Sequence, residues 1–337
     1  MTGPLLRAPD FWWQAPGALS GLLAPIGALY GAVAAQRLSG KGYRAKIPVI
    51  CIGNPTLGGA GKTPTAIAAG EILKANGRRP YFLTRGYGGN ERGPLIADPS
   101  KHSAREIGDE TLLLAALAPT VVAQDRAAGA KLAEENGADV IVMDDGFQNP
   151  SLTKDLSILV IDGTRGLGNS RVFPAGPLRA PLSAQFSGAQ AMLIIGDGNA
   201  GDEAAAHGKS AGLEVLRAKF SADAGAASQL KGKRVLAFAG IGDPEKFFRS
   251  LEAAGAEILV KRPLPDHHRL SAREANALIG EAANKGLALV TTEKDRARMQ
   301  GDEALASIRA KSLTLPVTLA FDDPLAFRNL LEKALKR

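Results

Sequence analysis

Short apolar runs alternate with helix-like segments along most of the chain. Six runs rich in β-branched residues predict strands, at 47–52, 80–84, 120–123, 139–143, 156–161 and 191–195. Helix-forming sequences separate several of these runs, at 63–76, 108–117 and 125–136. Strands that alternate with helices are typical of a mostly parallel sheet flanked by helices. The pattern therefore predicts an α/β fold.

A second, smaller alternating unit follows the segment 196–212, whose Gly, Ala and Asp content favours a loop or hinge. Its strand-like and helix-like segments lie at 234–240, 244–254, 257–261, 271–284 and 287–292. Two extended runs bracket this unit and are expected to pair as a ribbon between two domains, at 214–220 and 316–321. The predicted divisions are an N-terminal segment, a first domain onto which the helix within 322–337 packs back, and a smaller α/β domain, at 1–46, 47–212 and 213–321.

The uncharged stretch 11–36 departs from this alternation. It is long enough to cross a bilayer, for which about 20 apolar residues suffice, but Gln14, two prolines and four glycines interrupt it. Trp12 and Trp13 are of the residue type that favours the membrane–water interface. Four basic residues follow between positions 37 and 46, a collar suited to an anionic leaflet. We interpret the stretch as a membrane-associated helical segment; a buried helical hairpin and a secretory signal are the alternatives.

The amino-acid composition limits the compartments and the kinds of partner that the protein can have. The chain has 337 residues, 45% of them hydrophobic, so it can bury a sizeable core. Its single cysteine, Cys51, excludes a disulfide framework and a cysteine-rich zinc site, which fits a reducing compartment. The net charge of +7 suggests an anionic partner, such as a lipid surface or a phosphorylated substrate. No nucleic-acid-binding motif is recognisable, so we expect no nucleic acid, and no obligate protein partner is evident.

The sequence GNPTLGGAGKTPTA, residues 53–66, resembles a phosphate-binding P-loop that follows a strand and precedes a helix. Thr56 stands where the strict pattern has its first glycine, but Gly-Lys-Thr is intact. Glycines let backbone N–H groups converge on phosphate oxygens, and the helix N-terminus adds its dipole. Lys62 is predicted to reach the β- and γ-phosphates of ATP. The predicted nucleotide contacts are Thr56, Leu57, Gly58, Gly59, Ala60, Gly61, Lys62 and Thr63.

Two acids directly follow the apolar run 139–143, as expected for the metal-organising acid of a P-loop protein. Asp144 and Asp145 offer carboxylate oxygens, which Mg²⁺ prefers, and the Thr63 hydroxyl is expected at the same ion. The spacing does not distinguish which acid approaches the metal. A solvated turn at the strand end is the alternative.

The ordered set of motifs along the chain resembles the tetraacyldisaccharide 4′-kinases of lipid A synthesis. The motifs are APDFWW near the start, GNPTLGGAGKTP, LTRGYGG, GDE at 108–110, DDGFQ at 144–148, PAGPLR, AFAGIGDPEKFF, PDHH at 265–268 and TTEKD at 291–295. Each motif is weak evidence, whereas their joint order is specific. Many relatives have a glutamate where this chain has Ala180, which removes any role for a glutamate there.

The resemblance implies an enzyme with a P-loop NTPase-like fold that uses ATP and Mg²⁺ at the cytoplasmic face of the bacterial inner membrane. Its implied substrate is lipid A disaccharide 1-phosphate, and an anionic membrane surface is the implied partner. Asp109 is the implied proton acceptor, paired with His267, and Lys62 completes the catalytic set. Arginines suit bidentate phosphate contacts, and the candidate substrate contacts are Arg85, Tyr87, Arg126, Gln148 and Arg179.

Other interpretations remain open from the sequence. Asp109 precedes an apolar helical run and is also a good helix N-cap. His268 adjoins His267 and offers the same chemistry. A P-loop switch or metallochaperone ATPase shares the loop and the acid pair, but it has no evident need for the PDHH motif, the second unit or the apolar start.

Overall fold

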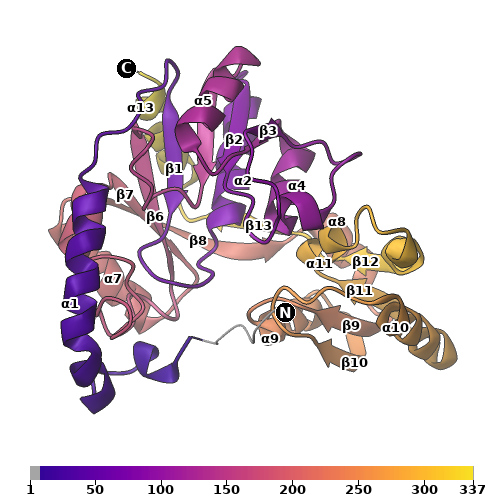
Figure 1. Cartoon of the computed structure of the whole chain (residues 1–337). Coiled ribbons are helices and arrows are strands. Elements are labelled where there is room, and N and C mark those ends of the chain that lie inside the picture. Colours follow the sequence, from indigo (N-terminus) through magenta and orange to yellow (C-terminus); the bar gives the residue numbers. More distant parts are fainter. Residues whose placement is uncertain (1–7, 337) are drawn as a thin grey trace.

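The computed structural model describes residues 8–336, which form a large and a small α/β lobe (Figure 1). The first seven residues of the predicted segment 1–46, and residue 337, lie outside the described residues. The large lobe is built on a nine-stranded sheet. Its strands are β1 (Val49–Gly53), β2 (Pro80–Thr84), β3 (Leu95–Ile96), β4 (Thr120–Val122), β5 (Val140–Asp144), β6 (Leu156–Asp162), β7 (Ala191–Ile195), β8 (Glu214–Ala222) and β13 (Val317–Phe321).

The strand order is β13-β8-β7-β6-β1-β5-β2-β4-β3. All neighbours run parallel except the pairs at the two edges, β8 with β13 and β3 with β4. The predicted mostly parallel α/β fold is therefore confirmed. The order reverses at β1, and ligands of open α/β sheets bind where such a reversal leaves a crevice beyond the carboxyl ends of the strands.

Helices cover both faces of this sheet. Strand residues alternate between two cores: Val49 and Cys51 belong to one, Ile50 and Ile52 to the other. The helices α5 (Arg126–Glu135), α6 (Leu182–Ser187) and α7 (Asn199–Ser210) close the first core. The second core is closed by α2 (Lys62–Ala75), α4 (Asp109–Leu117) and α13 (Pro324–Leu335). A short helix, α3 (Ala104–Ile107), precedes α4.

The helix α7 corrects one sequence expectation, because the segment 196–212 was predicted to be a loop or hinge. Its small residues let the helix approach the sheet closely. A Cβ added to Gly201 would lie 2.8 Å from Gly163 Cα, and one added to Gly208 would lie 2.9 Å from the Met192 side chain. The composition that resembles a loop is thus what the packing of this helix requires.

The small lobe has a four-stranded parallel sheet of order β10-β9-β11-β12. Its elements are α8 (Ala224–Leu230), β9 (Arg234–Ala239), α9 (Pro244–Ala253), β10 (Glu257–Pro263), α10 (Ala272–Lys285), β11 (Ala288–Thr291), α11 (Glu293–Arg298), η2 (Glu303–Leu305), α12 (Ala306–Lys311) and β12 (Ser312–Thr314). The antiparallel pair β8–β13 leads to and from this lobe, and both strands also belong to the large sheet. A domain boundary at residue 213 stays a prediction.

The apolar N-terminal stretch forms a 3-10 turn, η1 (Asp10–Trp13), and one continuous helix, α1 (Ala18–Leu38), beside the large lobe (Figure 1). The alternative of a buried helical hairpin is therefore wrong. The helix buries only Ser20, Gly27 and Gly31, and its glycines let it lie close to segment 172–181. It exposes a row of large apolar side chains: Leu19, Leu22, Ile26, Leu29, Tyr30 and Val33.

The packing of α1 predicts opposite effects for two glycine substitutions in the same helix. A Cβ at Gly27 would lie 2.8 Å from the Val172 carbonyl oxygen, whereas one at Gly21 would meet nothing within 4 Å. Gly27→Ala is therefore expected to destabilise the protein by about 1–3 kcal/mol through overpacking. Gly21→Ala should instead stabilise α1 by up to about 1 kcal/mol. Urea unfolding of the full chain measures both, and equal stability of the two variants would refute this packing.

Candidate functional site

The phosphate loop lies between β1 and α2, at the carboxyl end of the central strand of the large sheet. Gly58 and Gly61 adopt positive φ angles, 113° and 96°, which side-chain-bearing residues rarely adopt. A Cβ on Gly58 or Gly59 would meet no atom within 4 Å, so the loop faces open space. Asn54 braces the loop by donating from Nδ2 to the Thr56 and Gly58 carbonyls, at 2.7 and 3.1 Å. The loop is thus held open and in shape by its own chain.

The missing first glycine has a local explanation. Thr56 forms an antiparallel bridge with Leu178, which needs an extended backbone that any residue adopts. The Leu57 N–H donates to the Pro177 carbonyl at 2.8 Å, and Arg179 Nε donates to the Thr56 carbonyl at 3.0 Å. The segment 177–179 therefore fixes this side of the loop, and no special conformation is required at position 56.

Asp144 is the last residue of β5, and the parallel register brings it opposite Ile52, just before the loop. The Thr63 hydroxyl donates to its Oδ2 at 2.9 Å. Its other oxygen, Oδ1, is buried and has no hydrogen-bond partner among the described residues. Burial raises the pKa of Asp144 to about 7, and the charges of Glu110 and Asp145 add to the shift. Asp144 Oδ1 is therefore available as a ligand for a cation.

Asp145 is more exposed than Asp144 and already paired. Its carboxylate lies 3.7 Å from Lys62 Nζ and 3.4 Å from Arg179 Nη1. Arg179 Nη1 also lies 3.4 Å from Gln148 Oε1, and Gln148 Nε2 donates to the Asn54 carbonyl at 3.0 Å. Two of the candidate substrate contacts thus converge on the loop and the acid pair.

The remaining candidate substrate contacts differ in accessibility. Tyr87 is 52% exposed, and its ring packs edge-on against His267 with centroids 5.7 Å apart. Arg126 is nearly fully buried and donates to the Ala123 carbonyl, and its Nε has no hydrogen-bond partner within residues 8–336. Burial lowers the pKa of Arg126 to about 10, and the charge of Arg85 adds to this effect. A phosphate contact by Arg85 or Arg126 stays a prediction.

Asp109 and His267 come from different lobes and meet at the interface. Asp109 is the first residue of α4, whereas Gly108 holds the cap position, so the N-cap alternative for Asp109 is wrong. His267 lies in the turn after β10 with φ 56°, and its Nδ1 is 3.7 Å from Asp109 Oδ2. His268 instead pairs with Glu274 at 3.0 Å. Of the two adjacent histidines, only His267 thus contacts Asp109.

The charges around this pair shift both titrations. Burial alone would raise the pKa of Asp109. The contact with His267 and the charge of Arg298 outweigh burial and hold this pKa below its usual range. The Asp109 carboxylate in turn raises the pKa of His267. Asp109 is therefore ionised at neutral pH, and His267 is the member of the pair that titrates nearest to it.

One basic residue of α11, Arg298, was missed by the sequence interpretation, whereas Lys294 lies in the TTEKD motif. Arg298 contacts Asp109 through Nε at 2.7 Å and Nη2 at 2.6 Å. Lys294 pairs with Glu110 at 2.6 Å. Arg298 follows Asp295 by three residues, the spacing at which two side chains meet on a helix. That spacing indicates a local ion pair, but only the fold shows that the guanidinium reaches the other lobe.

Mg²⁺ fits the acids at the phosphate loop. Across residues 8–336, no group of three or more His, Cys, Asp or Glu side chains is placed to hold a metal ion by itself. Mg²⁺ is typically bound through one or two carboxylates together with substrate phosphates, and it retains several waters. The unpartnered Asp144 oxygen and the adjacent Thr63 hydroxyl provide such a partial set of ligands.

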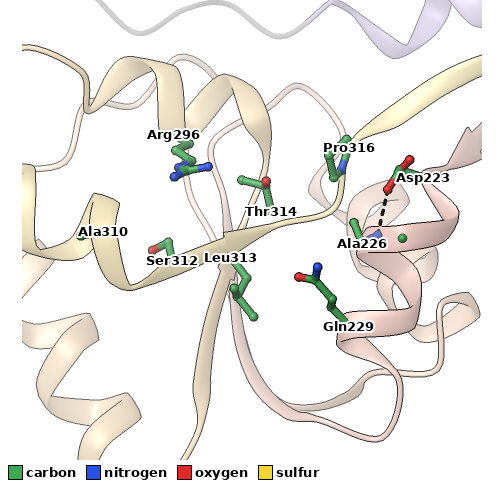
Figure 2. Close-up of a pocket in the computed structure, with 10 residues that line it drawn as sticks. Asp223, Ala226, Gln229, Arg296, Ala310, Ser312, Leu313, Thr314 and Pro316 are labelled. Atoms are coloured by element: carbon green, nitrogen blue, oxygen red, sulfur yellow. Dashed lines mark hydrogen bonds between the residues drawn. The ribbon is translucent and has the colours of Figure 1, made fainter.

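A hollow of about 380 Å³ lies elsewhere, at the base of the β8–β13 ribbon (Figure 2). Its lining includes Asp223, Gln229, Arg296 and Ser312. None of these residues belongs to the phosphate loop, the acid pair or the Asp109–His267 pair. The candidate site is therefore at the phosphate loop and the lobe interface.

Comparisons with known proteins show the family to which the sequence is similar. The sequence profile of the family described as tetraacyldisaccharide-1-P 4′-kinase matches residues 19–336. A tetraacyldisaccharide 4′-kinase from Nitrobacter winogradskyi is 52% identical over 326 residues, covering 97% of each chain. Another, from Methylobacterium sp. strain 4-46, is 54% identical over 334 residues, covering 98% of each chain.

The fold is also similar to a solved structure. A crystal structure of LpxK from Aquifex aeolicus in complex with ATP superposes with a TM-score of 0.72 at 26% identity. The match covers 94% of this chain and 99% of that one. The similarity therefore extends over both lobes.

The raised pKa of Asp144 predicts a gain in stability when its charge is removed. Its raised pKa means that the folded protein loses stability as pH rises from the ordinary aspartate range through about 7. Asp144→Asn should therefore stabilise the ligand-free protein at pH 8 by at least about 1.4 kcal/mol, the value of one pKa unit. The gain should shrink towards pH 5, where Asp144 is protonated.

Thermal unfolding with EDTA measures this gain. Asp145→Asn is the matched control, because Asp145 is exposed and already paired with two cations, and no gain is expected there. An Asp144→Asn protein less stable than wild type at pH 8 would show that the charge is compensated.

Proposed function

The chain belongs to the tetraacyldisaccharide-1-P 4′-kinase family, and from this premise we propose how its site works. The protein is a kinase; the proposed donor is ATP, and the proposed acceptor is the 4′-hydroxyl of tetraacyldisaccharide 1-phosphate, the lipid A disaccharide precursor. The presence of ATP in the similar Aquifex aeolicus structure supports the donor. The observation that carries the proposal is a carboxylate–imidazole pair brought by a second lobe to a phosphate-loop lobe.

The phosphates of ATP bind at the loop and the start of α2. Backbone N–H groups of the glycines surround them, and the α2 dipole favours their negative charge. Lys62 leaves its long contact with Asp145, 3.7 Å, for the β- and γ-phosphates. Mg²⁺ held by Thr63 and Asp144 would neutralise charge on the phosphate oxygens.

The Asp109–His267 pair takes the proton of the attacking hydroxyl. The 4′-oxygen forms a bond to the γ-phosphorus while the bond to the β,γ-bridging oxygen breaks, and ADP leaves with that electron pair. His267 receives the hydroxyl proton, and Asp109 stabilises the resulting imidazolium. Positioning and charge neutralisation, rather than covalent chemistry, therefore carry most of this transfer.

The substrate is a lipid, which suits the exposed apolar row of α1. We place the enzyme at the cytoplasmic face of the bacterial inner membrane, where ATP is available. Because α1 packs lengthwise on the large lobe, we propose that it lies in the interface rather than across the bilayer. Arg179, beside the phosphate loop, is the best-positioned candidate for the substrate's 1-phosphate or for a transferred oxygen.

Lys62→Ala should abolish phosphorylation of lipid A disaccharide 1-phosphate by Mg-ATP without loss of the fold, because it removes charge from the phosphate site and not from a core. Phosphorylated product is measured with purified protein. Lys209→Ala, on the exposed surface of α7, is the control and should retain full activity. Wild-type kcat in Lys62→Ala would exclude this phosphate site.

Asp109 and His267 are expected to behave as one unit. Each of Asp109→Asn and His267→Ala should lower kcat by about 10²- to 10⁴-fold, the scale of a positioned acid–base group. The double variant should fall little further. ATP affinity should hardly change, because neither residue touches the loop. Additive losses in a double-mutant cycle would contradict a joint role.

The apolar row of α1 should govern membrane binding. Leu22 and Leu29 are 75% and 72% exposed, and Leu325, on α13, is similarly exposed at 67%. Leu22→Glu with Leu29→Glu should abolish flotation with anionic vesicles at high salt, where the basic collar is screened. Leu325→Glu should float like wild type. Equal flotation of all three proteins would exclude α1 as the anchor.

A further inference from the structure

Arg298 makes more polar contacts than a simple ion pair requires. Its side chain is 5% exposed. Nε and Nη2 both contact one carboxylate oxygen, Asp109 Oδ2, at 2.7 and 2.6 Å. Nη1 donates to Asp295 Oδ1 at 2.7 Å and to the Gly240 carbonyl at 2.6 Å. Nη2 also lies 3.4 Å from His267 Nδ1.

The small lobe fixes this guanidinium from behind. Asp295 accepts from the Thr292 hydroxyl at 2.6 Å and from the Gly240 N–H at 3.1 Å through its second oxygen. Asp295 and Arg298 are both buried, and they lie one helical turn apart on α11. Arg298 is therefore held in place by its own lobe and presents its remaining N–H groups to the large lobe.

We propose that Arg298 is a positioning residue that holds Asp109 ionised and opposes protonation of His267 before the hydroxyl arrives. This inference rests on the proposed kinase function and deepens it. Two charged donors on Oδ2 make Asp109 a poor proton acceptor, so the transferred proton goes to His267. Arg298 does not accept the proton itself; it acts through Asp109 and His267.

The contact with His267 supports the second half of this role. Nη2 of Arg298 brings a cation within 3.4 Å of Nδ1, which disfavours a positive charge on the imidazole. Asp109 alone would stabilise a protonated His267, and a protonated imidazole cannot accept the hydroxyl proton. The cation of Arg298 opposes that effect. Arg298 thus keeps Asp109 charged and limits the degree to which Asp109 favours the protonated imidazole.

The other charged groups near Asp109 and His267 have partners of their own or contact only one of these two residues. Asp266 lies 3.9 Å from His267 Nε2, and Lys294 and Glu110 pair with each other across the interface. Arg269 donates to the Gly88 carbonyl at 3.0 Å. Tyr87 covers the imidazole ring. Arg298 is thus the one cation among these that contacts both members of the pair.

The test measures the His267 pKa by NMR titration of the full-length protein. The chain has four histidines, so loss of one signal in His267→Ala assigns it. In Arg298→Gln the His267 pKa should rise by about 1 unit, since a nearby cation that had lowered it is gone. The acid limb of the kcat–pH profile should move upwards by the same amount, and kcat at pH 7 should fall about tenfold.

Two further variants separate this role from simple lobe docking. Arg298→Lys retains the positive charge but loses the planar guanidinium with its several N–H donors. We therefore expect kcat to fall while the His267 pKa stays near its wild-type value. Gln300→Ala removes an uncharged contact between the lobes, to the Pro99 carbonyl, and should leave the pKa unchanged. If Arg298→Gln does not fold, Arg298→Met fills the same buried space and should show the same upward shift.

An unchanged His267 pKa in the folded Arg298→Gln or Arg298→Met protein would overturn the proposal. So would an equal shift in Gln300→Ala, because lobe contact alone would then explain it. A wild-type protein that does not phosphorylate the disaccharide would refute the proposed function instead, and the titration would still report whether Arg298 controls His267.

Discussion

The ion pair between Arg298 and Asp109 is the interaction on which the site depends, because it joins the two lobes beside His267, which is proposed to receive the proton. A buried pair costs much desolvation, and it persists only where further hydrogen bonds satisfy both partners. Here Asp295 and the Gly240 carbonyl accept hydrogen bonds from Nη1 of the Arg298 guanidinium. The phosphate loop belongs to one lobe and His267 to the other, so neither lobe alone contains the site.

Much of the fold could be predicted from the sequence because parallel strands buried on both faces are nearly continuous apolar runs. The predicted strands at 80–84 and 191–195 coincide with β2 and β7. The segment containing α7 was mispredicted, because the glycines that suggest a loop are also those that allow a helix to contact a sheet backbone. Local composition does not distinguish the two, since the distinction lies in the tertiary packing.

The sequence predicts the phosphate-loop part of the site better than the part around Asp109 and His267. The loop and Asp144 follow from local order, a strand followed by glycines or by an acid. The pairing of Asp109 with His267 came only from family resemblance, because the two residues are far apart in the chain and belong to separate lobes. For Arg298, the sequence offers only its three-residue spacing from Asp295, which indicates a local ion pair. No sequence pattern indicates a partner in the other lobe.

The two ends of the site also differ in how completely their polar groups are satisfied. At the proton-accepting end, every nitrogen of the Arg298 guanidinium has a partner. At the phosphate end, one buried oxygen of Asp144 has no hydrogen-bond partner in the described part of the chain, and Lys62 makes a long contact with Asp145. An unsatisfied buried carboxylate costs stability in the free protein, and binding of the proposed Mg²⁺ and ATP phosphates would offset that cost. The proton acceptor is therefore preorganised, whereas the phosphate site is completed by its ligand. Binding energy at the loop can thus be used to hold the lobes in the arrangement that Arg298 already defines.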